Sequence, residues 1–101
     1  MIIVSQDKCT IVNFNNIQNI RIEPYGTHIK GKKIYKIFAG NFEGYATELG
    51  TYDTEERAKE VLQEIVSKYK TTLYNSKTNE TVVNVSKVYE MPKEQGGLYG
   101  R

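Results

Sequence analysis

Apolar and polar residues alternate through the first half of the chain, and this alternation predicts strands. Five such segments, separated by turn residues, span 1–5, 9–14, 17–24, 34–40 and 45–52. A sixth alternating segment lies at 80–91, and Pro92 follows it. Period-two alternation is typical of strands whose two faces meet different surroundings. We therefore expect an antiparallel sheet of five to six strands, with Pro24 and Pro92 each ending a strand.

Between residues 53 and 73 the apolar spacing changes to that of a helix. The apolar positions recur at i, i+3 and i+4: Ala58, Val61, Leu62, Ile65, Val66 and Tyr69. Asp53 is expected to cap the helix, with Glu56 completing a capping box. Leu62 and Ile65 are expected at the centre of the buried stripe. The expected fold is α+β, with one amphipathic helix packed on the sheet. Residues 1–92 are expected to form a single domain and residues 93–101 a C-terminal tail.

The segment at 34–40 carries apolar residues on both of its faces. Ile37 shares one face with Tyr35, while Ile34 and Phe38 share the other. One helix covers only one face of a sheet, and an uncovered apolar face usually marks a partner. A closed barrel is the alternative, but we favour a homo-oligomer. Its interface is expected to contain two strand residues and three tail residues: Ile37, Phe38, Leu98, Tyr99 and Arg101.

Composition places the chain among ordinary globular domains, because 39% of its 101 residues are hydrophobic and 26% are charged. Cys9 is the only cysteine, which excludes an intramolecular disulfide and a thiolate metal cluster within one chain. We expect Cys9 to be a small buried residue, and we expect neither a metal nor a cofactor. The apolar start "MIIV" is too short for a signal peptide or a membrane span. A cytoplasmic protein without a membrane partner is therefore expected.

The charges are segregated along the chain, although the net charge is only +2. Residues 21–36 hold five basic groups and one acid, whereas residues 43–64 hold seven acids and two basic groups. The most charged stretch is "THIKGKKIYK" at 27–36. A basic pole of this kind can bind an anion. The candidate ligand-binding residues are Arg21, Tyr25, His28, Lys30, Lys32, Lys33, Tyr35 and Lys36.

Two interpretations of this basic stretch stay open. The lysines can hold phosphates while Tyr25 or Tyr35 stacks on a base. Alternatively, they are the solvated tip of a hairpin, where lysines prevent sheets from pairing edge to edge. Arg21 is the only arginine nearby, which argues against readout of a nucleic acid because bidentate phosphate contacts favour arginine.

Catalytic motifs are absent from the sequence. Gly26 and Gly31-Lys32-Lys33 have the spacing of a phosphate-binding loop but lack its final Ser or Thr. His28 is the only histidine, and no nucleophile stands at a fixed spacing from it. We therefore expect no catalytic residues and a protein that is not an enzyme.

Several stretches of the sequence carry a resemblance: "MIIVSQDK", the "NF" and "NI" after it, "ERAKEVLQEI" and "YEMPKE". Together they resemble small uncharacterised proteins of Firmicutes and of their phages and mobile elements. The resemblance covers residues 1–20, 50–70 and 88–94. It implies an intracellular accessory protein of phage type, and it assigns no role to any residue of the basic stretch.

Two functional hypotheses follow. In the first, a homo-oligomer captures a small anionic ligand, such as a nucleotide-like signal, and so antagonises a host defence by sequestration. In the second, an interaction module inhibits a host macromolecule through its charged surface.

Overall fold

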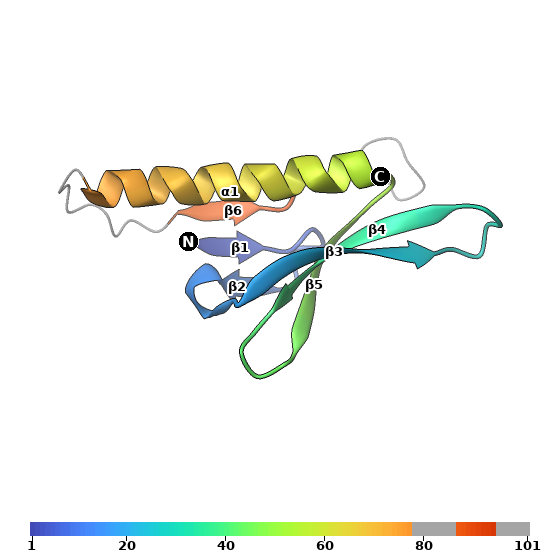
Figure 1. Cartoon of the computed structure of the whole chain (residues 1–101), viewed down its shortest axis with the longest axis horizontal. Helices are drawn as coiled ribbons and strands as arrows, with labels where there is room; N and C mark the ends of the chain where they lie inside the picture. The colour runs from blue at the N-terminus through green and yellow to red at the C-terminus, as the bar shows by residue number, and fades with distance from the viewer. Residues whose placement is uncertain (78–86, 95–101) are drawn as a thin grey trace.

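The computed structural model describes residues 1–77 and 87–94 of the chain (Figure 1). The strands are β1 (Ile2–Val4), β2 (Ile11–Asn13), β3 (Asn19–Gly26), β4 (Lys33–Gly40), β5 (Ala46–Tyr52) and β6 (Val88–Glu90). A short 3-10 helix, η1 (Phe14–Asn16), follows β2, and the helix α1 (Glu55–Lys77) follows β5. The α+β class and the packing of the helix on β-sheet are confirmed. The part of the expected last strand at 80–86 lies outside the described residues, as does most of the tail.

The strands form two three-stranded sheets, so the expectation of one sheet of five to six strands is wrong. One sheet has the order β2-β1-β6 and the other β3-β4-β5. Strand β6 runs parallel to β1, with Ile2 opposite Val88. The division arises at η1, where the Asn13 side chain accepts a hydrogen bond from the Asn15 N–H and the chain winds into a 3-10 turn. The chain therefore leaves the first sheet there, and β3 pairs with β4 instead of β2.

The side chain of Gln6 joins the two sheets. Its Nε2 donates hydrogen bonds to the carbonyls of Thr51 (3.0 Å) and Pro92 (3.1 Å), and its Oε1 accepts one from the Thr51 N–H (2.8 Å). The Gln6 N–H donates to the Leu49 carbonyl at 2.7 Å. The amide of Gln6 thus pairs with the edge of β5 as a neighbouring strand would.

The turn that presents Gln6 is held by the residues on either side of it. The Ser5 hydroxyl donates to Oδ1 of Asp7 at 2.6 Å, and the same oxygen accepts from the Cys9 N–H at 2.9 Å. These bonds, the first above all, lower the pKa of the Asp7 carboxyl below its ordinary value. Cys9 is exposed in this turn, so its expected burial is wrong. The turn displaces Cys9 from the strand, which begins only at Ile11.

The core lies between α1 and the inner faces of both sheets. Its fully or almost fully buried members are Ile3, Ile37, Ala39, Leu49, Tyr52, Ala58, Val61, Ile65 and Met91. The expected stripe on the helix is confirmed at Val61 and Ile65, but Val66 is 41% exposed and Leu62 is only half-buried. In the described part of the chain, no helix is long and apolar enough to cross a membrane.

Thr54, not Asp53, caps α1. The Thr54 Oγ1 accepts a hydrogen bond from the Arg57 N–H at 3.1 Å, and the Thr54 carbonyl accepts from the Ala58 N–H at 3.1 Å. The helix begins one residue later than a cap at Asp53 requires. The Asp53 N–H instead donates to Oε2 of Glu94 at 2.6 Å, which ties the helix start to the segment after β6.

Pro24 does not end β3, which continues to Gly26. Because β3 is at the edge of its sheet, only alternate residues donate to β4, and a proline at one of the other positions leaves the ladder intact. Pro24 stands opposite Tyr35 in this ladder.

Candidate functional site

The basic stretch forms the end of the β3–β4 hairpin. The two strands pair over their full length, from Asn19 opposite Gly40 to Gly26 opposite Lys33. The loop at 27–32 lies at one end of the view in Figure 1, away from β1 and β2. A hydrogen bond from the Lys32 N–H to the Ile29 carbonyl (3.0 Å) closes a tight turn, in which Gly31 adopts a φ of +80° that glycine tolerates.

Three lysines at this end of the hairpin, Lys30, Lys32 and Lys33, are called here the tip lysines. Lys30 and Lys33 are exposed and Lys32 is half-exposed, and His28 is exposed beside them. None of the three forms an ion pair with another described residue. Their positive charge is therefore directed to solvent instead of to an acid in the described part of the chain.

The outer face of the β3-β4-β5 sheet, which points away from α1, combines aromatic rings with cations. Its members are Arg21, Glu23, Tyr25, Ile34, Lys36, Phe38 and Glu48. The Phe38 ring centroid lies 6.0 Å from that of Tyr25. Cζ of Arg21 lies 5.6 Å from the Phe38 centroid, and Nζ of Lys36 lies 5.3 Å from the Tyr25 centroid. These distances are typical of cation–π contacts, which fix both rings on the sheet.

Two acids partly neutralise this outer face. Arg21 donates from Nε to Oε2 of Glu23, and Nζ of Lys36 lies 3.1 Å from Oε1 of Glu48. Arg21 and Lys36 therefore differ from the tip lysines, because each already has an anionic partner. The Tyr25 ring remains 40% exposed at the end of the face nearest the tip.

The structure separates the eight predicted ligand-binding residues into three groups. Arg21, Tyr25 and Lys36 lie on the outer face, whereas His28 and the tip lysines lie on and beside the loop. Tyr35 packs against the core on the opposite face of the sheet.

The predicted interface residues are also separated. Ile37 is fully buried in the core of the single chain, while Phe38 is half-buried on the outer face. Leu98, Tyr99 and Arg101 lie outside the described residues.

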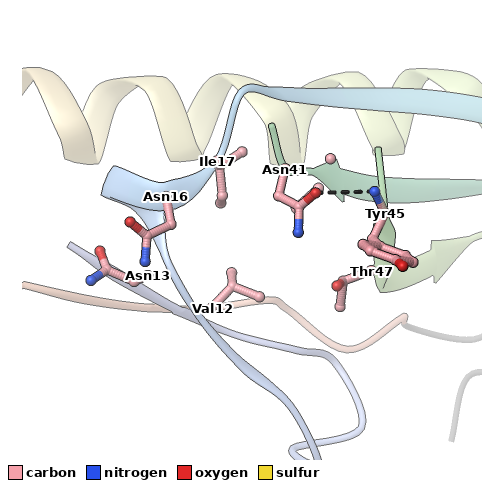
Figure 2. Close-up of a pocket in the computed structure, with 9 residues that line it drawn as sticks. Val12, Asn13, Asn16, Ile17, Asn41, Tyr45 and Thr47 are labelled. Atoms are coloured by element: carbon pink, nitrogen blue, oxygen red, sulfur yellow. Dashed lines mark hydrogen bonds between the residues drawn. The ribbon is translucent and has the colours of Figure 1, made fainter. Parts of the chain in front are cut away.

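A pocket that sequence reasoning missed lies between η1 and the turn that joins β4 to β5 (Figure 2). We call it the amide pocket, because Asn13, Asn16 and Asn41 line it together with Tyr45 and Thr47. Its volume is about 180 Å³. The sequence places Asn13 in the strand expected at 9–14 and Asn16 and Asn41 in turns, and nothing in it indicates that these segments meet.

A second hollow, of about 500 Å³, lies at the start of α1 and is lined by Asp53, Thr54, Arg57, Glu60 and Glu94. The Arg57 guanidinium is already occupied, with NH1 lying 3.0 Å from Oε1 of Glu60 and Cζ lying 6.0 Å from the Tyr52 centroid. Burial raises the pKa of the Tyr52 phenol, and its hydroxyl donates to the Pro92 carbonyl at 2.8 Å. The Arg57 guanidinium and the Tyr52 hydroxyl therefore have partners, but Oδ1 of Asp53, which lines the hollow, is buried without a hydrogen-bond partner among the described residues.

The described residues contain no group of three or more His, Cys, Asp or Glu side chains arranged to hold a metal ion. Cys9 and His28 lie in separate turns of different sheets. The chemistry offered by the described surface is therefore cation–π contact, unpaired positive charge and amide hydrogen bonding.

Comparisons with protein-family models, with curated proteins and with solved structures found no match to this chain. Function is therefore inferred from the geometry of the hairpin and the pocket.

Proposed function

We propose that this protein is a non-enzymatic binding module that engages an acidic protein surface through the tip lysines and the adjacent outer face. The observation that carries the proposal is that the tip lysines gather on one short segment and form no ion pair with another described residue. Elsewhere, Lys8 lies 2.6 Å from Glu90 and Lys59 lies 3.5 Å from Glu55. Three unpaired lysines on one short loop and the first residue of β4 create a positive pole that attracts an anionic partner.

The shape of the site favours a macromolecule over a small ligand. Small ligands are usually bound in concave sites that bury most of their surface. The tip lysines instead lie at the end of an extended hairpin (Figure 1). An acidic protein surface suits them better than a nucleic acid does, because lysine acts as a point charge and Arg21, the arginine of the adjacent outer face, is paired with Glu23.

The outer face supplies the contacts that charge alone does not. Tyrosine and arginine are enriched among the residues that dominate binding energy in protein interfaces. Tyr25 offers an exposed ring whose position Lys36 and Phe38 fix. We assign the tip lysines to attraction of the partner and Tyr25 to its anchoring.

A second candidate function is capture of a nucleotide-like anion by a homo-oligomer. It is favoured by the cation of Lys36 beside the exposed Tyr25 ring, because a base can stack there while its phosphate meets a lysine. In this arrangement a second copy closes the site over the outer face. Either function suits the accessory protein of phage type that the resemblance implies, acting on a host protein or a host signal.

Removing the charge of the tip lysines is expected to weaken binding to an acidic peptide about tenfold, since exposed charge pairs contribute about 0.2–1 kcal/mol each. The variant is the triple substitution Lys30→Gln, Lys32→Gln and Lys33→Gln. The probe is a fluorescein-labelled 20-residue peptide rich in glutamate, measured by fluorescence anisotropy at low salt. Affinity of the parent protein should fall as salt is added.

The matched control is a triple substitution of exposed lysines elsewhere: Lys59→Gln, Lys70→Gln and Lys93→Gln. It removes the same charge and should weaken binding less than threefold. Equal losses of peptide affinity in both triple variants would show that only the net charge matters. The tip lysines would then be the solvated end of a hairpin and not a binding site. Tighter binding of single-stranded DNA than of the peptide would overturn the choice of an acidic protein.

Sedimentation of the parent protein tests the second candidate. A homo-oligomer at micromolar concentration is expected if a subunit interface closes the site. A single species of 11.6 kDa, with or without ATP present, would remove this candidate and leave the acidic-surface proposal intact.

A further inference from the structure

The amide pocket is the feature that the proposed function does not use. Two of its asparagines are fixed by backbone groups of their own turns. Oδ1 of Asn13 accepts from the Asn15 N–H at 2.9 Å, and Oδ1 of Asn41 accepts from the Tyr45 N–H at 3.0 Å and the Glu43 N–H at 2.9 Å. Because a backbone N–H only donates, the atoms that accept are the carbonyl oxygens. The two NH2 groups are therefore the free ends.

The remaining polar groups of the pocket are also free. The Asn16 amide and the Thr47 hydroxyl form no hydrogen bond with another described residue. Figure 2 shows the nitrogens of Asn16 and Asn41 on either side of the space above Val12. The lining carries no charged side chain, and Val12, Ile17 and Ala39 supply apolar walls. The pocket thus offers several hydrogen-bond donors in a neutral setting.

Tyr45 adds a flat surface beside these donors. It lines the pocket, and 71% of it is exposed. Exposed aromatic rings stack on planar ligands and contribute about 1–3 kcal/mol per base where bases are bound. The volume of about 180 Å³ is below that of pockets for larger ligands, so it suits one ring.

We propose that the amide pocket binds an uncharged planar ring that carries carbonyl acceptors, of the kind found in uracil. The NH2 groups of Asn16 and Asn41, which Figure 2 shows on either side of the space, donate to the two carbonyl oxygens. Tyr45 stacks on the ring.

Uridine is the probe, with cytidine as its closest analogue. Cytidine carries an amino group where uridine has its second carbonyl. The NH2 group of an asparagine would therefore face the amino group of the base, and both are hydrogen-bond donors. Titration followed by 1H–15N correlation spectra is expected to move the side-chain NH2 signals of Asn16 and Asn41. Uridine should bind at least tenfold more tightly than cytidine. Failure of uridine to bind at its solubility limit would overturn the proposal.

Asn41→Asp is the decisive variant. Aspartate keeps an oxygen that accepts from the Glu43 and Tyr45 N–H groups, so the turn is retained, but it replaces the NH2 donor with a second acceptor. Binding of uridine should weaken at least tenfold, with little change in thermal unfolding. Asn15→Asp is the matched control, since it makes the same charge change beside the pocket without lining it; its affinity should stay within twofold of the parent.

Three results would count against this assignment. Uridine binding by Asn41→Asp that equals that of the parent would overturn it. So would methyl glucoside or ribose alone binding as tightly as uridine, because the carbonyl groups would then not be recognised. The site lies on a different part of the chain from the tip lysines, so the triple lysine variant should bind uridine as the parent does, and a parallel loss would contradict a separate pocket.

Discussion

Replacement of Ile65 by alanine is expected to lower the free energy of unfolding by about 3–4 kcal/mol, within the range for large-to-small changes in cores. Ile65 is 1% exposed and lies in the core with Ile37, Tyr52 and Met91. The surrounding residues come from both sheets and from the segment after β6. They are held by backbone pairing and cannot collapse fully into the space left by the removed carbons. Urea unfolding at constant pH measures the loss.

Leu62→Ala is the control for this substitution. Leu62 is half-buried and lines an open groove of about 360 Å³, which Ile65 also borders although only 1% of Ile65 is exposed. Water reaches this groove, so removal of the side chain leaves no closed cavity, and we expect a cost of about 1 kcal/mol. A cost at Leu62 equal to or above that at Ile65 would show that the buried face of α1 is wrongly assigned.

The helix could be predicted from the sequence because its signal is local. A spacing of three and four residues defines one face wherever the helix lies. The expected place of Leu62 at the centre of that face is wrong, because burial along the face depends on what packs there. Val66 and Leu62 border the groove beside η1 and β3, and they remain partly open to solvent.

The sheets could not be predicted as well as the strands. Alternation predicts that a segment is a strand, but it does not identify the partner of that strand. The parallel pairing of Ile2 with Val88 joins residues from opposite ends of the chain. The 3-10 turn at Phe14–Asn16 separates the sheets, and "NN" in the sequence suits a tight hairpin turn equally well.

The two candidate sites, the tip lysines and the amide pocket, also differ in how far the sequence predicts them. The tip lysines could be identified because Gly31 and the charges mark a turn within ten residues. Strand alternation places Tyr35 and Lys36 on opposite faces, although both are among the expected ligand-binding residues. The amide pocket was not visible. Pairing of Asn19 with Gly40, extended by the Gln18 N–H donating to the Gly40 carbonyl at 2.7 Å, brings its two turns together.

Replacement of Gln6 by alanine is expected to cost about 2–4 kcal/mol, although Gln6 is not a core residue. Its amide makes three hydrogen bonds that join the first sheet to β5 and to Pro92. Alanine leaves the partly buried Thr51 N–H and two carbonyls without these partners. Urea unfolding gives the cost, and faster hydrogen exchange of the Thr51 amide should accompany it. Gln18→Ala is the control, because Gln18 is exposed, and it should change stability by less than about 0.5 kcal/mol.

Gln6→Glu tests how the stability cost at this position depends on pH. Glutamate keeps an oxygen that accepts from the Thr51 N–H, but its charged form places an anion against the carbonyls of Thr51 and Pro92. Folding therefore raises the pKa of the new carboxyl above its unfolded value, and the folded state binds more protons than the unfolded state. The variant should be less stable than the parent at pH 7, and the difference should shrink as the pH falls through the raised pKa, because the protonated group donates to one carbonyl. A stability difference that stays constant between pH 7 and pH 4 would show that the Gln6 amide does not face these two carbonyls in solution.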